Sequence, residues 1–446
     1  MGNENSATPV EEEDEEKPGG GGGGFPSNED VSLTWHSYLV HCDELIGTGG
    51  FSRVYKASVF APLEGEPGNS GGEASKSHHP HHPHRRRLQH RLTHLLPRLR
   101  KPHDVPLAES PVSEGCFQPC ALKVIPKSLV AGSASGDTSS EESQQLQEKE
   151  VMVALTAGGV PHVVRLYWSW SDPSYYYLLM ELCPRPSASL WAFLRQLKEH
   201  GALLEEQDLR FIAHQLAEAL LAVHAAGFIY RDVKPENVLL TPDKEVRLID
   251  FGLALRLGEP SEEGGQRQVS ARSGTFRYLS PELLGSEGAL HGTPHDWWGL
   301  GMLLFVCSSL EYPFDSQLLD KPKQLFAAIK DPEVLPAYQR ISHLSPQGVA
   351  FIQALLDKDP SRRLGDRDIL QHPWLCDPPS KPSPNLACAR LNASYDVDQA
   401  VPLRPQELDL LHRTLAIPSE PAQIAADPFY SHVALPPRLA QSSGRV

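Results

Sequence analysis

The sequence predicts an α+β protein in which a small antiparallel β lobe precedes a larger, mainly helical lobe. Aromatic and β-branched residues flank a glycine turn in residues 33–60, a pattern typical of a β-hairpin. Further strand-like segments follow at 117–127, 163–170 and 175–183. From Ala188 onward apolar residues recur at helical spacing. Two lobes of different secondary structure are therefore expected.

Within the first lobe, the stretch 144–158 interrupts the strands with a helical pattern. Leu146, Val151, Met152 and Leu155 would lie near one face of that helix. In the second lobe the clearest helical patterns are 208–227 and 297–310. No internal repeat is present.

Four segments do not follow these patterns. Residues 1–32 combine an acidic block with a glycine run, which predicts a disordered tail. Residues 61–115 are rich in Pro, Gly, Ser and His and predict a disordered basic and His-rich insertion; a second polar gap covers 131–143. Residues 376–446 are proline-rich and predict an irregular tail that at best wraps over the domain.

Composition narrows the protein class. The 446 residues, 40% hydrophobic and 22% charged, suit a globular protein of two or three domains or one large enzyme domain. The net charge of -15 makes broad nucleic-acid binding unlikely. Seven scattered cysteines without CxxC pairs argue against a disulfide framework and a structural zinc. No apolar run approaches a membrane span and no secretion signal is evident, so a cytoplasmic protein is expected. Nothing indicates an oligomeric state.

A glycine turn and a strand lysine are the first candidates for chemistry. "IGTGGFSRVYKA" places Gly47 and Gly49 between two strands, where the backbone could close over phosphates, although an ordinary hairpin would look the same. "ALKVI" places Lys123 within an apolar strand, where a buried ammonium needs a carboxylate or phosphate, unless it reaches solvent at an edge. Glu148 is the candidate partner on the following helix, with Glu150 in reserve.

The segment "YRDVKPENVLL", residues 230–240, concentrates polar groups suited to phosphoryl transfer. Asp232 can orient a hydroxyl, Lys234 can neutralise a phosphoryl group, and Asn237 can offer an oxygen to a metal ion. Eighteen residues after Asp232 the sequence "DFG" supplies Asp250, a carboxylate that can bind Mg²⁺. Each fragment alone could be a surface pair or a turn, but their order along the chain points to one site.

These motifs together resemble the eukaryotic protein kinases over about residues 36–375. The resemblance implies the two-lobed kinase fold, with a kinase domain at 33–375 whose small lobe ends near 183 and whose large lobe is 184–375, and ATP and Mg²⁺ in the cleft. It implies that Lys123 holds the α- and β-phosphates and pairs with Glu148, that Asp232 orients the substrate hydroxyl, and that Asn237 and Asp250 bind the metal. The implied nucleotide-binding residues also include Ile46, Gly47, Thr48, Gly49, Gly50, Phe51, Ser52, Val54, Met180 as gatekeeper, and Glu181 and Cys183 in the hinge.

Further positions match the large lobe of the family. "GTFRYLSPE" resembles the substrate-docking segment, so Glu282 is expected to pair with Arg363. "DWWGLG" resembles the central helix, with Asp296, Trp298 and Gly301 at its characteristic positions. Lys234 and Thr275 resemble serine/threonine enzymes rather than tyrosine kinases.

Tyr230 in place of the usual histidine resembles the AGC group, especially its ribosomal-protein-kinase-related members, and so do "DWWGLGMLLF", "DPSRRLGD" and "HPWL". The resemblance implies that residues 376–446 are an AGC-like C-terminal tail. Ala271 stands where that group carries a phosphorylatable threonine, so activation by loop phosphorylation is not expected to follow the usual scheme. "DPFYSHVAL" lacks the first aromatic of the group's tail motif, so docking of the tail onto the small lobe is expected to be lost or altered. Arg277 replaces the glutamate of "GTPEY" while Glu236 is kept, which predicts a weak or shifted preference for basic substrates.

Two signals suggest contact with a membrane surface. "MGNENS" fits the pattern for myristoylation of Gly2. Residues 85–101 hold seven Arg and Lys, no acids, and leucines at helical spacing. That segment could bind a membrane surface, a calmodulin-like partner or nucleic acid, or remain a solvated loop; it could also pair with the acidic run 11–16.

The sequence thus predicts a protein serine/threonine kinase that transfers the γ-phosphate of MgATP to protein substrates. The alternative from another class is a catalytically weak, kinase-like scaffold that binds ATP or partner proteins, which the insertion and the altered tail would favour. A small-molecule kinase is a third reading, weakened by the substrate-docking segment.

Overall fold

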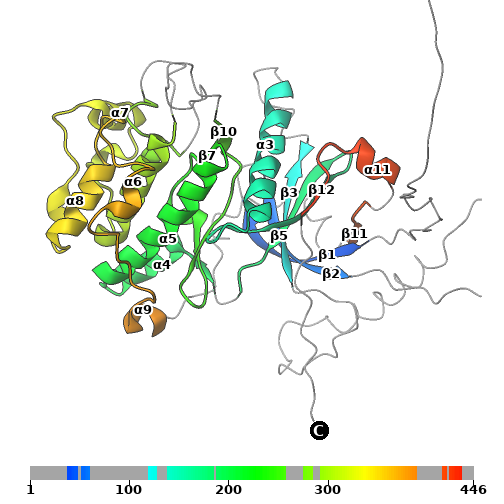
Figure 1. Cartoon of the computed structure of the whole chain (residues 1–446), viewed down its shortest axis with the longest axis horizontal. Coiled ribbons are helices and arrows are strands. Elements are labelled where there is room, and N and C mark those ends of the chain that lie inside the picture. Colours follow the sequence, from blue (N-terminus) through cyan, green and yellow to red (C-terminus); the bar gives the residue numbers. More distant parts are fainter. Residues whose placement is uncertain are drawn as a thin grey trace, which may run out of the picture. The chain divides into compact units, whose positions relative to one another are not determined.

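A computed structural model describes the chain in nine stretches, all within one compact unit that begins at Ser37 (Figure 1). The described residues are 38–48, 52–60, 119–127, 138–184, 187–257, 275–284, 292–388, 414–418 and 421–433. The predicted tail 1–32 and insertion 61–115 therefore lie outside the described residues.

A seven-stranded antiparallel sheet forms the smaller lobe. Its strand order is β11-β1-β2-β3-β5-β4-β12. The five central strands follow one another along the chain. They are β1 (Leu39–Thr48), β2 (Arg53–Phe60), β3 (Cys120–Pro126), β4 (Leu166–Ser171) and β5 (Tyr175–Glu181). Gly47 pairs with Val54, and Val54 with Lys123, so the glycine turn and the strand lysine share one line across the sheet.

Both faces of this sheet are covered, which explains the apolar run on β3. Cys120, Leu122 and Val124 pack in one apolar cluster, whereas Ala121 and Ile125 pack in the other, together with residues of helix α3 (Thr138–Ala157). Because side chains alternate along a strand, Lys123 shares the face of Ala121 and Ile125. The lysine therefore points to the side of the sheet where α3 lies.

Helix α3 begins six residues before the predicted 144–158. Its first two turns fall in the polar stretch 131–143, which was wrongly assigned to a gap. The apolar spacing that indicates a helix starts only at Leu146, so the pattern could not mark the earlier beginning.

The C-terminal tail contributes short strands at both edges of the sheet. β11 (Thr414–Ala416) pairs with β1, and β12 (Ser431–His432) pairs with β4. Between them lies helix α11 (Pro421–Ala426). The prediction of an irregular tail is wrong at these places, because strands of two or three residues are too short to show an alternating pattern.

The larger lobe is mainly helical. Its helices are α4 (Leu190–Glu199), α5 (Glu206–Ala225), α6 (Pro294–Ser309), α7 (Pro322–Lys330), α8 (Pro346–Leu355) and α9 (Pro384–Cys388). All residues of α6 from His295 to Ser308 are buried. A helix that is apolar all round belongs in the centre of a packed domain, and α6 contacts both α5 and α8. This architecture confirms the predicted two-lobed α+β fold.

Small hairpin strands bring the polar motifs together. β8 (Val238–Leu240) pairs with β6 (Ala188–Ser189) and with β9 (Val246–Leu248), and β10 (Leu255–Arg256) pairs with β7 (Phe228–Ile229). The segment before β8 and the segment after β9 therefore lie side by side at the open end of one hairpin. Their polar residues must lie close in space although eighteen positions separate Asp232 from Asp250.

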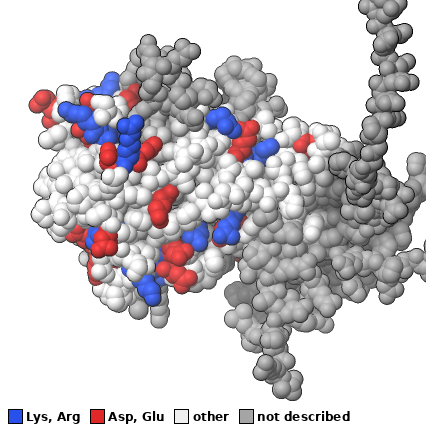
Figure 2. All heavy atoms as spheres, in the orientation of Figure 1, with Lys and Arg blue, Asp and Glu red and all other residues white. Residues whose placement is uncertain are grey.

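Charged side chains on the described surface are mixed in sign. On the face drawn in Figure 2, Lys and Arg lie beside Asp and Glu in small groups, without a continuous basic band. None of the helices in the described part of the chain is long and apolar enough to cross a membrane.

Candidate active site

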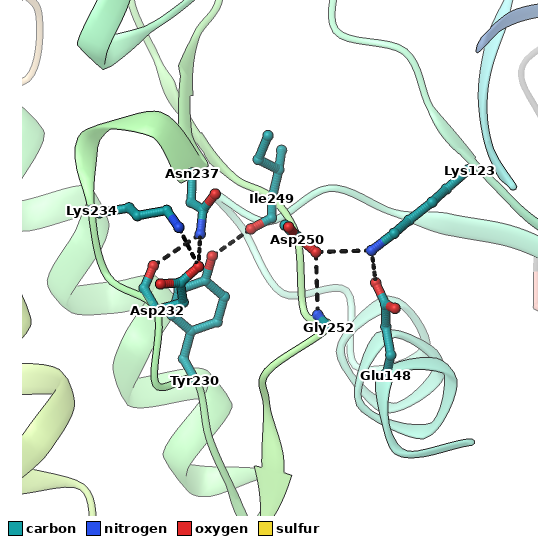
Figure 3. Close-up of polar contacts among 9 residues, drawn as sticks. All are labelled: Lys123, Glu148, Tyr230, Asp232, Lys234, Asn237, Ile249, Asp250 and Gly252. Atoms are coloured by element: carbon teal, nitrogen blue, oxygen red, sulfur yellow. Dashed lines mark hydrogen bonds and ion pairs between the residues drawn. The ribbon is translucent and has the colours of Figure 1, made fainter. Parts of the chain in front are cut away.

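Lys123 joins the two lobes through two carboxylates (Figure 3). Its Nζ donates to Glu148 Oε1 on α3 at 2.6 Å and to Asp250 Oδ1 at 2.8 Å. The backbone N–H of Gly252 also donates to Asp250 Oδ1, at 3.3 Å. The expected pairing of Lys123 with Glu148 is confirmed, whereas the reserve candidate Glu150 instead pairs with Arg256 at 3.1 Å.

The pKa directions in this cluster favour the charged forms of Lys123 and Asp250. Burial alone would lower the pKa of Lys123, but the Asp250 and Glu148 carboxylates outweigh it and raise that pKa. The Lys123 ammonium lowers the pKa of the Asp250 carboxyl despite burial. Burial raises the pKa of Glu148, and Lys123 opposes that rise. The ionised Asp250 carboxylate supplies oxygen atoms of the kind that a divalent cation prefers.

Asp232 lies in a second polar cluster. Lys234 Nζ donates to Asp232 Oδ2 at 2.7 Å and to Thr275 Oγ1 at 2.7 Å, while Thr275 Oγ1 donates to Asp232 Oδ1 at 2.8 Å. Asn237 Nδ2 donates to Asp232 Oδ2 at 2.7 Å and to its backbone oxygen at 3.0 Å. These four side chains, predicted as catalytic residues, are thus brought into direct contact, and both carboxylate oxygens of Asp232 have fixed donors.

Asn237 is oriented by these bonds. Since its amide nitrogen points at Asp232, its amide oxygen points away from that carboxylate (Figure 3). The backbone oxygen of Asn237 accepts from the N–H of Ile249 at 3.0 Å, so the loop that carries Asn237 is tied to the residue before Asp250. Asp250 and the Asn237 amide oxygen are the pair of oxygen donors that could share a metal ion with phosphate.

A buried carboxylate on α6 holds the backbone of this loop. Asp296 accepts hydrogen bonds from the N–H of Tyr230 at 2.8 Å and of Arg231 at 2.7 Å. Arg231 has a φ of 69° and Asp250 a φ of 59°, in the left-handed region that non-glycine residues rarely adopt. Two charge-assisted bonds next to Arg231 help to stabilise that backbone.

Aromatic packing fixes the position of the "DFG" segment. Phe251 is fully buried, and its ring meets the edge of the Tyr230 ring with 5.3 Å between centroids. The Tyr230 hydroxyl donates to the backbone oxygen of Ile249. Asp250 is therefore held between two anchored neighbours, with its carboxylate on Lys123.

The predicted nucleotide pocket is described in part. Ile46, Val54 and Met180 pack in the apolar cluster that lies on the Lys123 side of the sheet. Gly47 and Thr48 end β1, and Ser52 precedes β2. Gly49, Gly50 and Phe51 lie outside the described residues.

The hinge candidates lie at the end of β5 and just after it: Glu181 is its last residue, and Cys183 follows. The N–H of Glu181 donates to the oxygen of Arg165 at 2.9 Å. Cys183 is buried, and burial raises the pKa of its thiol to about 12, so this thiol stays protonated and unreactive at neutral pH.

Residues 117–375, more than half of the chain, match the family described as "Protein kinase domain". The chain belongs to the protein kinase family. It is 33% identical to the serine/threonine-protein kinase PLK4 of Danio rerio over 215 residues, which are 48% of this chain and 21% of that relative.

The match extends over a larger share of two cAMP-dependent protein kinase catalytic subunits. The chain is 32% identical to the human cAMP-dependent protein kinase catalytic subunit PRKX over 239 residues, 52% of this chain and 60% of that protein. It is 31% identical to a probable cAMP-dependent protein kinase catalytic subunit of Encephalitozoon cuniculi over 266 residues, 56% of this chain and 75% of that protein. The chain spans between 20% and 30% of the length of the first PLK4 relatives it matches.

The segment predicted to dock the substrate is fixed within the larger lobe by an ion pair. Arg363 donates to both carboxylate oxygens of Glu282, at 2.7 and 3.0 Å, as expected from the sequence. A third bond runs from Arg363 Nε to the backbone oxygen of Asp357 at 2.9 Å. The bidentate geometry fixes the segment that begins at Thr275.

Two supporting residues of the kinase site were missed in the sequence. His224 Nε2 lies 2.7 Å from Asp296 Oδ2, and His224 Nδ1 lies 2.9 Å from Asp366 Oδ1. Asp366 also accepts from Trp297 Nε1 at 2.6 Å. No sequence signal marks this contact, because His224 and Asp366 are 142 positions apart and each looks like an ordinary polar residue.

Proposed function

We propose that this protein is a serine/threonine protein kinase that uses MgATP. The observation that carries the proposal is the contact of Asp232 with both Lys234 and Thr275, beside an Asp250 held by Lys123. A carboxylate for an acceptor hydroxyl, two ammonium groups for phosphate oxygens, and oxygen donors for a cation are the groups that phosphoryl transfer requires.

Each residue has a distinct part in that reaction. Asp232, with its two oxygens fixed by neighbours, would accept the hydrogen bond of the substrate hydroxyl and orient its oxygen. Lys234 would neutralise charge on the transferring group, and Lys123, held by Glu148, would bind the phosphates of the bound nucleotide. Asn237 and Asp250 would hold Mg²⁺, which when bound neutralises phosphate charge.

We further propose that the protein is AGC-like. Tyr230 at the start of "YRDVKPEN", the similarity to cAMP-dependent kinase catalytic subunits and the packing of the tail on the small lobe support this assignment. In that tail Phe429 is buried against the Tyr176 ring at 4.8 Å, and Asp427 accepts from the N–H and hydroxyl of Ser171. The tail thus docks on the small lobe without the first aromatic of the motif, through Phe429 and Tyr430.

We also propose a cytoplasmic protein with a membrane-associated fraction. The support lies in the sequence, in the acylation pattern at Gly2 and the basic segment 85–101, both outside the described residues. One acyl chain binds membranes only marginally, so both signals should be required. Flotation of the wild type, Gly2→Ala and a form with neutralised arginines in 85–101, on vesicles with and without anionic lipid, would test this requirement.

The kinase proposal is tested with two variants of the full chain. Asp232→Asn and Lys123→Met should each abolish phosphate transfer from MgATP to a generic protein substrate, because each removes a charge that the transfer needs. Thermal unfolding with and without MgATP separates the roles: Asp232→Asn should still be stabilised by nucleotide, and Lys123→Met should be stabilised less.

The same measurement decides between an enzyme and a scaffold. If the wild type binds nucleotide but transfers no phosphate to any protein, including itself, the protein is a kinase-like scaffold. Transfer that persists in purified Asp232→Asn would show that the role given to Asp232 is wrong.

A further inference from the structure

We propose that Arg277 sets the charge preference of this kinase for residues near the acceptor Ser or Thr, favouring an acidic neighbour over a basic one. The inference rests on the proposed kinase function. Arg277 lies two residues after Thr275, whose hydroxyl touches Asp232 at 2.8 Å. Two residues of chain span about 7 Å at most, so a peptide whose hydroxyl reaches Asp232 must pass close to Arg277.

The Arg277 guanidinium is held on an aromatic platform. Its central carbon lies 5.2 Å from the Phe276 ring centroid and 5.8 Å from the Tyr312 ring centroid. Tyr312 is itself fixed, because its hydroxyl donates to that of Tyr278 at 3.2 Å and Arg340 donates to its backbone oxygen at 2.8 Å. A positive charge anchored in this way loses little freedom when it meets a ligand.

The present partner of Arg277 is easily replaced. Nη2 donates to Asp320 Oδ1 at 3.2 Å, and the Asp320 side chain is 92% exposed. Such an exposed, single-contact pair contributes little to stability. Among the described residues Arg277 Nε is buried without a hydrogen-bond partner. A guanidinium has five N–H donors and matches a carboxylate well, so a carboxylate on the peptide can exchange with Asp320.

The neighbouring charges do not cancel that of Arg277. Lys234 is paired with Asp232, and Glu311 is paired with Arg340 at 3.1 Å. Glu236 is the exposed acid on the loop that carries Asp232, and it would favour a basic residue. Glu236 and Arg277 lie on different segments, and Arg277 adds repulsion against any basic residue of the peptide that comes near it.

The test uses matched peptides and the full-length protein with MgATP. Each peptide has one serine in an alanine and glycine background, with a single Glu or a single Arg placed at each of the three positions before and after the serine. The measured quantity is the ratio of kcat/KM for the Glu peptide to that for the Arg peptide at each position. The wild type should give a ratio above one for at least one position.

Three variants sharpen the test. Arg277→Glu should lower that ratio by roughly three- to tenfold, and Arg277→Gln by a smaller factor, since it removes the charge without reversing it. Asp320→Asn should raise the ratio, because it frees the guanidinium. Arg362→Glu makes the same charge reversal at an exposed site that pairs with Asp357, and it should leave the ratio unchanged.

The outcomes separate this inference from the proposed function. If the wild type phosphorylates the peptides but prefers Arg at all six positions, or if both Arg277 variants keep the wild-type ratio, the inference is overturned and the kinase assignment stands. If the wild type phosphorylates no peptide and no protein, the proposed function fails and this inference fails with it.

Discussion

Stability at alkaline pH should depend on His224. The ring is buried at the end of α5, with Asp296 Oδ2 at 2.7 Å from one nitrogen and Asp366 Oδ1 at 2.9 Å from the other. Both nitrogens face carboxylate acceptors, so the ring should carry two protons. Burial alone would lower the pKa of His224, but the two carboxylates outweigh it and raise the pKa from 6.5 to about 9.

The sign of the effect follows from this raised pKa. The protonated ring stabilises the fold fully below pH 6.5, and that stabilisation is lost as the pH rises to about 9. The total change is about 3 kcal/mol, at no more than about 1.4 kcal/mol per pH unit. His162, His295 and His372 have lowered pKa values, so their titration in the folded protein lies below this window.

Urea unfolding of the full chain between pH 6.5 and 8.5 at constant ionic strength measures the effect. The free energy of unfolding of the wild type should fall with pH, while that of His224→Gln should start lower and stay nearly flat. His343→Gln, at an exposed histidine, serves as the control and should keep the wild-type slope. A wild-type profile that is flat in this range, or a His224→Gln profile as steep as the wild type, would refute the reasoning.

Three other substitutions test the packing around the site. Phe429→Ala removes a buried ring and should release residues 421–433 from the sheet, seen as faster limited proteolysis there; unchanged protection would contradict the docking described above. Gly301→Ala places a Cβ 2.8 Å from the Leu355 Cβ and should cost about 1–3 kcal/mol, measured by thermal unfolding. Arg363→Ala leaves Glu282 without its bidentate partner and should cost about 3–5 kcal/mol; an unchanged melting temperature would speak against this pair.

The sequence predicted the polar groups that meet at the site because a buried charge without a partner is costly. An ammonium at Lys123 within a buried strand requires a carboxylate, and the helical pattern placed Glu148 one turn before the apolar Val151 and Met152. Asp232 and Asp250 were predicted together from their order along the chain. The β8–β9 hairpin explains this order, because it brings the residues after β9 back beside the residues before β8.

The supporting contacts could not be predicted in the same way. The contact between His224 and Asp366 depends on how α5 packs against the segment around the 3-10 turn Ile369–Gln371, which no local pattern records. The strands β11 and β12 owe their existence to free edges of a sheet built from residues hundreds of positions away. Tertiary context decided these features, whereas periodicity and residue chemistry decided the core and the polar site.

The tail and the nucleotide site are connected through adjacent positions of α3. Glu148 faces Lys123, and the next residue, Lys149, donates to the backbone oxygen of Pro428 at 2.9 Å and lies 5.8 Å from the Phe429 ring centroid. Neighbouring residues on a helix point about 100° apart. One contact on each of these two faces therefore fixes the rotation of α3 about its own axis, so tail docking and the Lys123–Glu148 pair favour the same helix position.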